Sequence, residues 1–398
     1  MVVLRHPLRW AGEAISRQTG SKELVTDPES LAAQTLSIRV DVGVVLPAVV
    51  PMGRRVSSLD GLRVVAALAV FLSHWVGLGG PAWWVDWLPI SILWNGQAAV
   101  IFFLILSGFA LTRSLERIPP SFSNYWRFIG VRILRIYPLY WAALALALGL
   151  RLTLSSPPGL ALWGAWAQTM WLDALDLRQL LAHVFLIGPG LNSRAVNPVI
   201  WVLVAEMRMS FLMPLLVWSL PRLKPRALTL GAMMLTALIA SKFQQLFYLP
   251  LFVLGTVMSH YYAALVRKFR ELGRLGWLLI GLAAILCMTV RVPDSALLPY
   301  SVTMELAAVG WAAVMVAADA MPVLKNVLCG AKLQSMAGLS YAFYLVHLPI
   351  LLAFASRWPW RSTIGWLILG IVSLVVSFAV AYAAFRWVER PIALAAKR

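Results

Sequence analysis

Apolar runs recur along this chain at nearly even spacing, and short polar stretches separate them. A transmembrane α-helix needs about 20 mostly apolar residues, and most of the runs are about that long. The pattern therefore predicts an all-α integral membrane protein with about ten transmembrane helices. We expect the spans at about 60–78, 98–115, 131–152, 198–218, 227–242, 245–262, 275–291, 299–318, 336–356 and 364–387.

The segments outside these spans differ in character. Residues 1–56 are polar and mixed in charge, which predicts an N-terminal tail; the alternative is that Met52 is the native start and the preceding residues are a mis-called extension. Residues 57–392 form the expected membrane domain, followed by a short C-terminal tail at 393–398. The longest connection, about 153–197, contains the amphipathic stretch DALDLRQLLAHVFLIG, which we expect to lie along a membrane interface.

Lysine and arginine orient the spans, because cytoplasmic loops carry an excess of both. With the N-terminus inside, only a few of the 34 basic residues fall in outer connections. This asymmetry predicts cytoplasmic N- and C-termini, and we expect the bacterial inner membrane. The outer basic residues are Arg151, Arg178, Arg194, Lys242, Arg291, Arg357 and Arg361.

Composition agrees with the membrane class and excludes two others. The chain has 398 residues, of which 61% are hydrophobic and 13% charged. The net charge of +18 would suit nucleic acid, but the basic residues lie in short loops between apolar runs, so no nucleic-acid partner is expected. Cys287 and Cys329 have no metal-site spacing and no disulfide framework.

Four ionisable residues inside the expected spans stand out as candidates: His74, Glu206, Glu305 and His347. Such groups are costly in hydrocarbon unless they are paired or hydrated, so each is a candidate functional residue. The alternatives are packing roles for the two histidines, a structural ion pair between Glu206 and Arg208, and a solvated edge position for Glu305. Asn197 and Pro198 predict the start of the helix that carries Glu206.

Arginines at the cytoplasmic ends suggest a phosphate site. Arg63 precedes His74 by eleven residues, about three helical turns, so both lie on one helix face roughly 16 Å apart. Arg132 and Arg135 are three residues apart and also share a face. Arginine binds phosphate bidentately. A ligand with phosphates at the surface and a reactive end near the midplane fits this arrangement, and coenzyme A has that shape.

Five stretches together resemble the acyltransferase-3 family of membrane O-acyltransferases, whose signature is an arginine followed by ten residues and a histidine. Arg63 and His74 meet that spacing. The resemblance covers about residues 57–392. The matching stretches, in family order, are LDGLRVVAALAVFLSHW (59–75), FFLILSGFALT (102–112), VRILRIYPLYW (131–141), SYAFYLVHLPI (340–350) and FRWVERPI (385–392).

The resemblance implies transfer of an acyl group, usually acetyl, from acyl-CoA to a hydroxyl. Typical acceptors are sugars of surface polysaccharides; peptidoglycan, lipids and antibiotics also occur. We expect His74 to act as general base or to carry the acyl group itself, and Glu206 to orient its imidazole. Arg63, Arg132 and Arg135 are expected to bind the CoA phosphates.

Three more residues complete the expected site. His347, Glu305 and Glu389 are expected along the substrate path, with Glu389 at its cytoplasmic rim. No metal and no tightly bound cofactor is required; acyl-CoA is a co-substrate. The chain departs from the family pattern at 207–210, directly after Glu206. This departure argues against the family's usual polysaccharide acceptor. The alternatives are a transporter or flippase without acyl-transfer chemistry, and a structural or sensor membrane protein.

Overall fold

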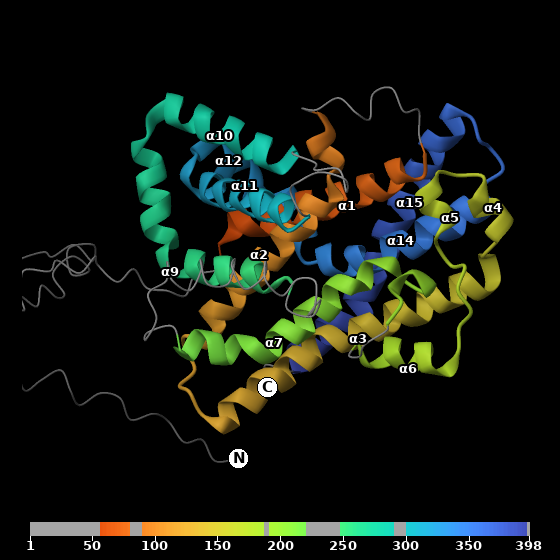
Figure 1. Cartoon of the computed structure of the whole chain (residues 1–398), viewed down its shortest axis with the longest axis horizontal. Helices are drawn as coiled ribbons and strands as arrows, with labels where there is room; N and C mark the ends of the chain where they lie inside the picture. The colour runs from red at the N-terminus through yellow and green to blue at the C-terminus, as the bar shows by residue number, and fades with distance from the viewer. Residues whose placement is uncertain (1–55, 80–89, 187–190, 220–246, 290–299, 396–398) are drawn as a thin grey trace, which may run out of the picture. The chain divides into compact units, whose positions relative to one another are not determined.

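A computed structural model describes residues 56–79, 90–186, 191–219, 247–289 and 300–395 (Figure 1). Helices make up the ordered elements of these residues, and no strand occurs among them. The prediction of an all-α chain is therefore confirmed for this part of the sequence. The expected N-terminal tail and the expected span at 227–242 lie outside the described residues.

Seven described helices are long and apolar enough to cross a membrane. An eighth span results if α13 (Ala331–Ala337) and α14 (Ser340–Arg357), which meet at 71°, count as one. The apolar helix α10 (Gly273–Thr289) is shorter, at 17 residues. Ten spans and cytoplasmic termini therefore stay predictions. The seven are α1 (Ser57–Gly77), α2 (Gly96–Leu115), α3 (Phe122–Leu154), η4 with α7 (Pro198–Ile200 and Trp201–Ser219), α9 (Leu249–Glu271), α11 (Tyr300–Ala320) and α15 (Thr363–Ala384).

Small residues let α2 and α9 cross closely. A Cβ atom added at Gly108 would lie 2.3 Å from the carbonyl oxygen of Phe252, and one at Gly255 would lie 2.0 Å from that of Ile105. Within a turn of this crossing, the hydroxyl of Thr112 donates to that of Thr256 over 3.0 Å. Close backbone approach through glycine is a common way for helices to associate in a membrane.

Helix α1 packs against five other α-helices, and many of its side chains are therefore buried inside the bundle. These helices are α2, α11, α12 (Pro322–Leu328), α13 and α14. Near its C-terminus, the indoles of Trp75 and Trp366 stack with centroids 4.0 Å apart. Each indole N–H donates to the other residue's backbone carbonyl, over 3.0 and 3.3 Å. Gly370 makes room for this pair, since a Cβ there would lie 2.4 Å from Trp75. The pair ties α1 to α15 directly beside His74.

The long connection after α3 contains the short helices α4 (Pro157–Ala161), α5 (Ala165–Gln168) and α6 (Leu177–Phe185). Helix α6 falls within the amphipathic stretch and begins after Asp176, whose side chain accepts from the Gln179 N–H. Tyr140 and Trp141 of α3 donate to backbone carbonyls of α6. The amphipathic stretch thus contains a short helix, and its position at a membrane interface stays a prediction.

The same connection folds back over the end of α1. The backbone N–H of Gly164 donates to the carbonyl of Leu78 over 2.8 Å, and the indole N–H of Trp163 donates to the carbonyl of Ala355 over 2.9 Å. These two contacts fix the loop before α5 against α1 and α14. As a result, Trp166 on α5 lies over the last turn of α1, where His74 is.

Candidate functional site

Two histidines from helices far apart in the sequence meet inside the bundle. The Nδ1 atom of His74 lies 3.1 Å from the Nε2 atom of His347. Their rings are nearly parallel, with centroids 5.3 Å apart. His347 is fully buried, and its Nδ1 atom lies 3.1 Å from the carbonyl oxygen of Phe343, one turn earlier on α14.

This chain of contacts determines the tautomers of the neutral pair. A carbonyl oxygen only accepts, so Nδ1 of His347 carries its hydrogen and donates to Phe343. The Nε2 atom of His347 is then an acceptor, and Nδ1 of His74 is the donor to it. The remaining nitrogen of His74, Nε2, therefore keeps its lone pair, which is the state that a general base requires.

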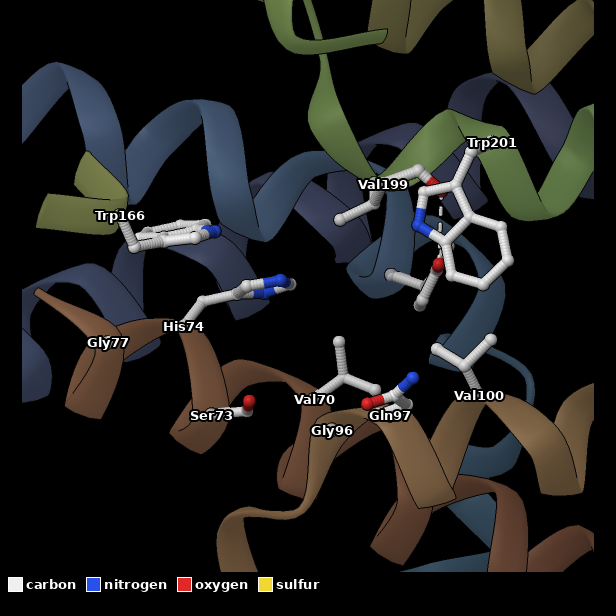
Figure 2. A pocket seen from close by; sticks show the side chains of 11 residues that line it. Val70, Ser73, His74, Gly77, Gly96, Gln97, Val100, Trp166, Val199 and Trp201 are labelled. Atoms are coloured by element: carbon white, nitrogen blue, oxygen red, sulfur yellow. Dashed lines mark hydrogen bonds between the residues drawn. The ribbon is translucent and has the colours of Figure 1, made fainter. Parts of the chain in front are cut away.

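The ring of His74 extends into a cavity of about 440 Å³ under the indole of Trp166 (Figure 2). The two rings stack with centroids 5.3 Å apart and planes inclined by 19°. Ser73 and Gln97 bring a hydroxyl and an amide to the wall opposite Trp166. Trp201 lines the same cavity from the first residue of α7. The cavity thus combines one basic nitrogen with polar donors and large aromatic walls.

A second cavity, of about 210 Å³, gathers most of the other residues singled out in the sequence. Three cations and two carboxylates from four elements line it, including Glu389 on the π-helix η7 (Phe385–Glu389). Three guanidinium groups, one from α1 and two from α3, lining one cavity form a site suited to phosphate groups. The charged lining residues are Arg63, Arg132, Arg135, Glu206 and Glu389, and Tyr344 lines the same cavity.

Arg132 is the most rigidly held of these cations. It is buried, and its Nε–H donates to the hydroxyl of Ser210 over 3.2 Å. That hydroxyl donates in turn to the backbone carbonyl of Glu206 over 2.7 Å. The Glu206 carboxylate lies 3.9 Å from Nη2 of Arg132, at ion-pair distance. Helix α7 therefore fixes the position of Arg132 through Ser210 and partly neutralises its positive charge through Glu206.

One side chain, Tyr344, lines both cavities. Its hydroxyl donates to the carbonyl of Val199 over 3.0 Å, where η4 leads into α7. Its ring meets Phe103 edge to face, with centroids 5.8 Å apart. The phenol thus stands at the boundary between the arginine-lined cavity and the His74 cavity, attached to the start of α7.

Two residues lie elsewhere than expected. Glu206 was expected to orient the His74 imidazole, but its carboxylate lies near Arg132 and lines the other cavity. His347 was expected along the substrate path, but it contacts Nδ1 of His74 and is not among the residues that line either cavity. Glu206 lies on the side of α7 that faces α3, which carries Arg132, and its carboxylate therefore meets Arg132 rather than His74.

Glu305 is half-buried on α11 and lines neither the His74 cavity nor the arginine-lined cavity. The structure brings Arg63, Arg132, Arg135 and Glu389 around one cavity, as expected for a shared binding region. Among the described residues, no group of three or more His, Cys, Asp or Glu side chains is placed to hold a metal ion.

Several site residues carry no recognisable signal in the sequence. Trp166 lies in a connection whose course over α1 cannot be read from its apolar pattern. Ser210 belongs to the stretch that departs from the family pattern, yet it binds Arg132. Tyr344 has a partial signal, because it stands three residues before His347 within the matching stretch SYAFYLVHLPI.

Comparison with known proteins adds one finding. The acyltransferase-3 family model, described as an acyltransferase domain, matches residues 56–385. No curated protein and no solved structure matches the chain. The matched region includes both histidines, the three arginines and Tyr344, and it ends before Glu389. Because this region covers most of the 398 residues, the chain belongs to the acyltransferase-3 family, as an acyltransferase-type protein with several apolar helices long enough to span a membrane.

Proposed function

We propose that this protein transfers an acyl group, acetyl in the first instance, from acyl-CoA to a hydroxyl of a sugar-containing acceptor. The observation that carries the proposal is the His74–His347 pair, which leaves a basic nitrogen of His74 facing a cavity. A second cavity with three arginines adjoins it at Tyr344. A base next to a phosphate-binding region is what a transfer from coenzyme A requires.

The donor's phosphates bind to Arg63, Arg132 and Arg135, with Arg132 held in place by Ser210. The pantetheine arm then runs along α1 past Tyr344 toward His74, a distance of roughly 16 Å along the helix axis. The orientation expected from lysine and arginine puts the Arg63 end of α1 in the cytoplasm of a bacterial cell, where acyl-CoA is available.

His74 performs the proton transfers. Its Nε2 atom takes the proton of the acceptor hydroxyl as the oxygen attacks the thioester carbonyl carbon. When the carbon–sulfur bond breaks, the imidazolium returns that proton to the departing thiolate. His347 keeps the reactive tautomer in place because its Nε2 atom accepts a hydrogen bond from the Nδ1–H of His74. Trp166 stacks on the ring and stabilises the imidazolium by a cation–π interaction.

Purified protein with acetyl-CoA labelled in the acetyl group tests the proposal. A general base contributes about 10²–10⁴-fold to a rate, so His74→Gln is expected to lower transfer to sugar acceptors by that factor. His260→Gln is the matched control, since His260 pairs with Glu116 away from both cavities. Label that stays on CoA with every acceptor would favour a transporter, and full activity of His74→Gln would remove the base.

A further inference from the structure

A third cavity, of about 260 Å³, opens just beyond the end of α1. Its walls include Leu78 and Gly79, which follow α1 directly, and Trp163 and Trp366 from the loop before α5 and from α15. The three cavities therefore follow one another along α1. Along α1, Arg63 lines the arginine-lined cavity, His74 lines the 440 Å³ cavity, and the residues after Gly77 line the third cavity.

The third cavity contains one cation, Arg361, and none of its lining residues is acidic. The guanidinium lies over the Trp163 ring, 4.4 Å from its centroid. Nη1 donates to the carbonyl of Ala355 over 3.4 Å, and Nη2 donates to that of Gly159 over 3.3 Å. Arginine has five N–H donors in a planar fork, so these two contacts leave donors for a ligand. An anion such as carboxylate or phosphate matches that fork.

The aromatic walls are fixed in place. The indole N–H of Trp163 is bound to the Ala355 carbonyl, and that of Trp366 to the Trp75 carbonyl. Both residues are mostly buried, with 8% of Trp163 and 2% of Trp366 exposed, so they offer a ligand a small apolar surface and no indole N–H. Ser362 and Thr363 add hydroxyl groups to the same wall. Fixed indoles, hydroxyls and a guanidinium together suit a ring-shaped polyhydroxy ligand that carries a negative charge.

The position of this cavity links it to the chemistry. Leu78 and Gly79 follow His74 by four and five residues, about 6–8 Å along a helix axis. That offset is comparable to the size of one sugar unit. The opposite end of α1, at Arg63, faces the cavity assigned to the donor, so the third cavity lies on the side left for the acceptor.

We propose that this third cavity binds an anionic sugar unit of the acceptor, with Arg361 holding its carboxylate or phosphate group and the indoles contacting its ring. The inference deepens the proposed function and rests on it for the identity of the bound molecule as acceptor. It makes acidic glycans, rather than neutral ones, the substrate class.

Three soluble probes test the proposal on the full-length protein in detergent: methyl glucoside, methyl glucuronide and methyl glucoside 6-phosphate. Transfer from labelled acetyl-CoA is measured for each probe, and so is the shift in Tm that each produces without any donor. We expect at least one charged probe to show a kcat/KM at least tenfold above that of the neutral glucoside. Which charged probe prevails distinguishes a carboxylate from a phosphate acceptor.

Arg361→Gln is expected to raise KM for the preferred charged probe about tenfold and to abolish its Tm shift, with the neutral glucoside unchanged. Arg361→Lys is expected to restore part of the preference. Arg357→Gln is the matched control: Arg357, the last residue of α14, is also exposed, but it donates to the Leu154 carbonyl and does not line the cavity.

Equal use of charged and neutral probes by the wild-type protein would overturn the proposal. So would an equal loss with both kinds of probe in Arg361→Gln, which would make Arg361 a structural clamp on Gly159 and Ala355. A Tm shift that depends on Arg361, without transfer to any probe, would instead keep the anion site and contradict the proposed function.

Discussion

The Nδ1 atom of His74 lies 3.1 Å from the Nε2 atom of His347, a residue 273 positions later in the chain. A neutral imidazole here occupies the place that a carboxylate holds in the Ser-His-Asp arrangement. It fixes the tautomer of His74 without adding a negative charge beside it. In the proposed mechanism, the stacked ring of Trp166 stabilises the positive charge that forms on His74.

The orienting contact predicts a difference between two substitutions at His347. His347→Phe removes the acceptor for Nδ1 of His74, and we expect kcat to fall by about 10²-fold or more, with KM for acyl-CoA unchanged. His347→Gln keeps a side-chain oxygen that accepts a hydrogen bond, and it should retain more activity. Steady-state kinetics on both variants measure this. Equal activity of the two variants would exclude an orienting role.

Substitution of Arg132 is expected to weaken binding of the phosphate groups of acyl-CoA. Charge-assisted hydrogen bonds contribute about 1.5–3 kcal/mol each, so Arg132→Ala should raise KM for acyl-CoA about tenfold or more. Ser210→Ala should produce a smaller rise, because Arg132 loses its anchor. Arg127→Ala is the control, since Arg127 is exposed on α3 outside the cavity.

Comparing acyl-CoA with its 3′-dephospho form identifies the contact. If Arg132 binds the 3′-phosphate, the variant loses the difference in KM between the two donors, and if it binds the pyrophosphate, the difference persists at a higher KM. A KM equal to that of the wild-type protein for both donors would remove Arg132 from donor binding.

Shortening the side chain of Tyr344 is expected to increase hydrolysis of acyl-CoA. Its ring stands between the two cavities, so Tyr344→Ala should join them and admit water to the thioester. We expect faster release of free CoA from acyl-CoA in the absence of an acceptor. Tyr344→Phe keeps the ring and loses only the hydrogen bond to Val199, so its CoA release should stay near the wild-type rate. A Tyr344→Ala protein of normal Tm with no added hydrolysis would contradict the barrier role.

The close crossing of α2 and α9 leaves no room for a side chain at Gly255, so a substitution there is expected to lower stability. A methyl group at Gly255 would overlap the backbone of α2, and such overpacking costs about 1–3 kcal/mol or more. Gly255→Ala should therefore lower Tm in detergent. Gly149→Ala is the matched control, because a Cβ at Gly149 on α3 meets nothing within 4 Å. Equal Tm values for the two variants would show that the helices separate easily at this crossing.

Local features of the fold were accessible from the sequence. Asn197 and Pro198 predicted a helix start, and the Asn197 side chain indeed accepts from the Val199 N–H as η4 begins. The eleven-residue spacing placed Arg63 and His74 on one helix, and the structure assigns them to adjoining cavities. Periodicity along one helix is enough for such predictions, because it depends on neighbours within a few turns.

Contacts between distant helices were not accessible in the same way. Whether Glu206 faces His74 or Arg132 depends on the rotation of α7 about its own axis, and the apolar residues on nearly all sides of α7 give no preferred face. For the same reason, the sequence does not distinguish a packing role for His347 from a functional one. Only the meeting of α1 with α14 brings its ring to His74.

The stacked indoles of Trp75 and Trp366 resist relative movement of α1 and α15. Sliding one helix past the other would break both of their hydrogen bonds and their stacking. Because Trp75 directly follows His74, this brace also holds the backbone that carries the imidazole. Loss of either indole should therefore disturb the His74–His347 contact as well as the packing of the two helices.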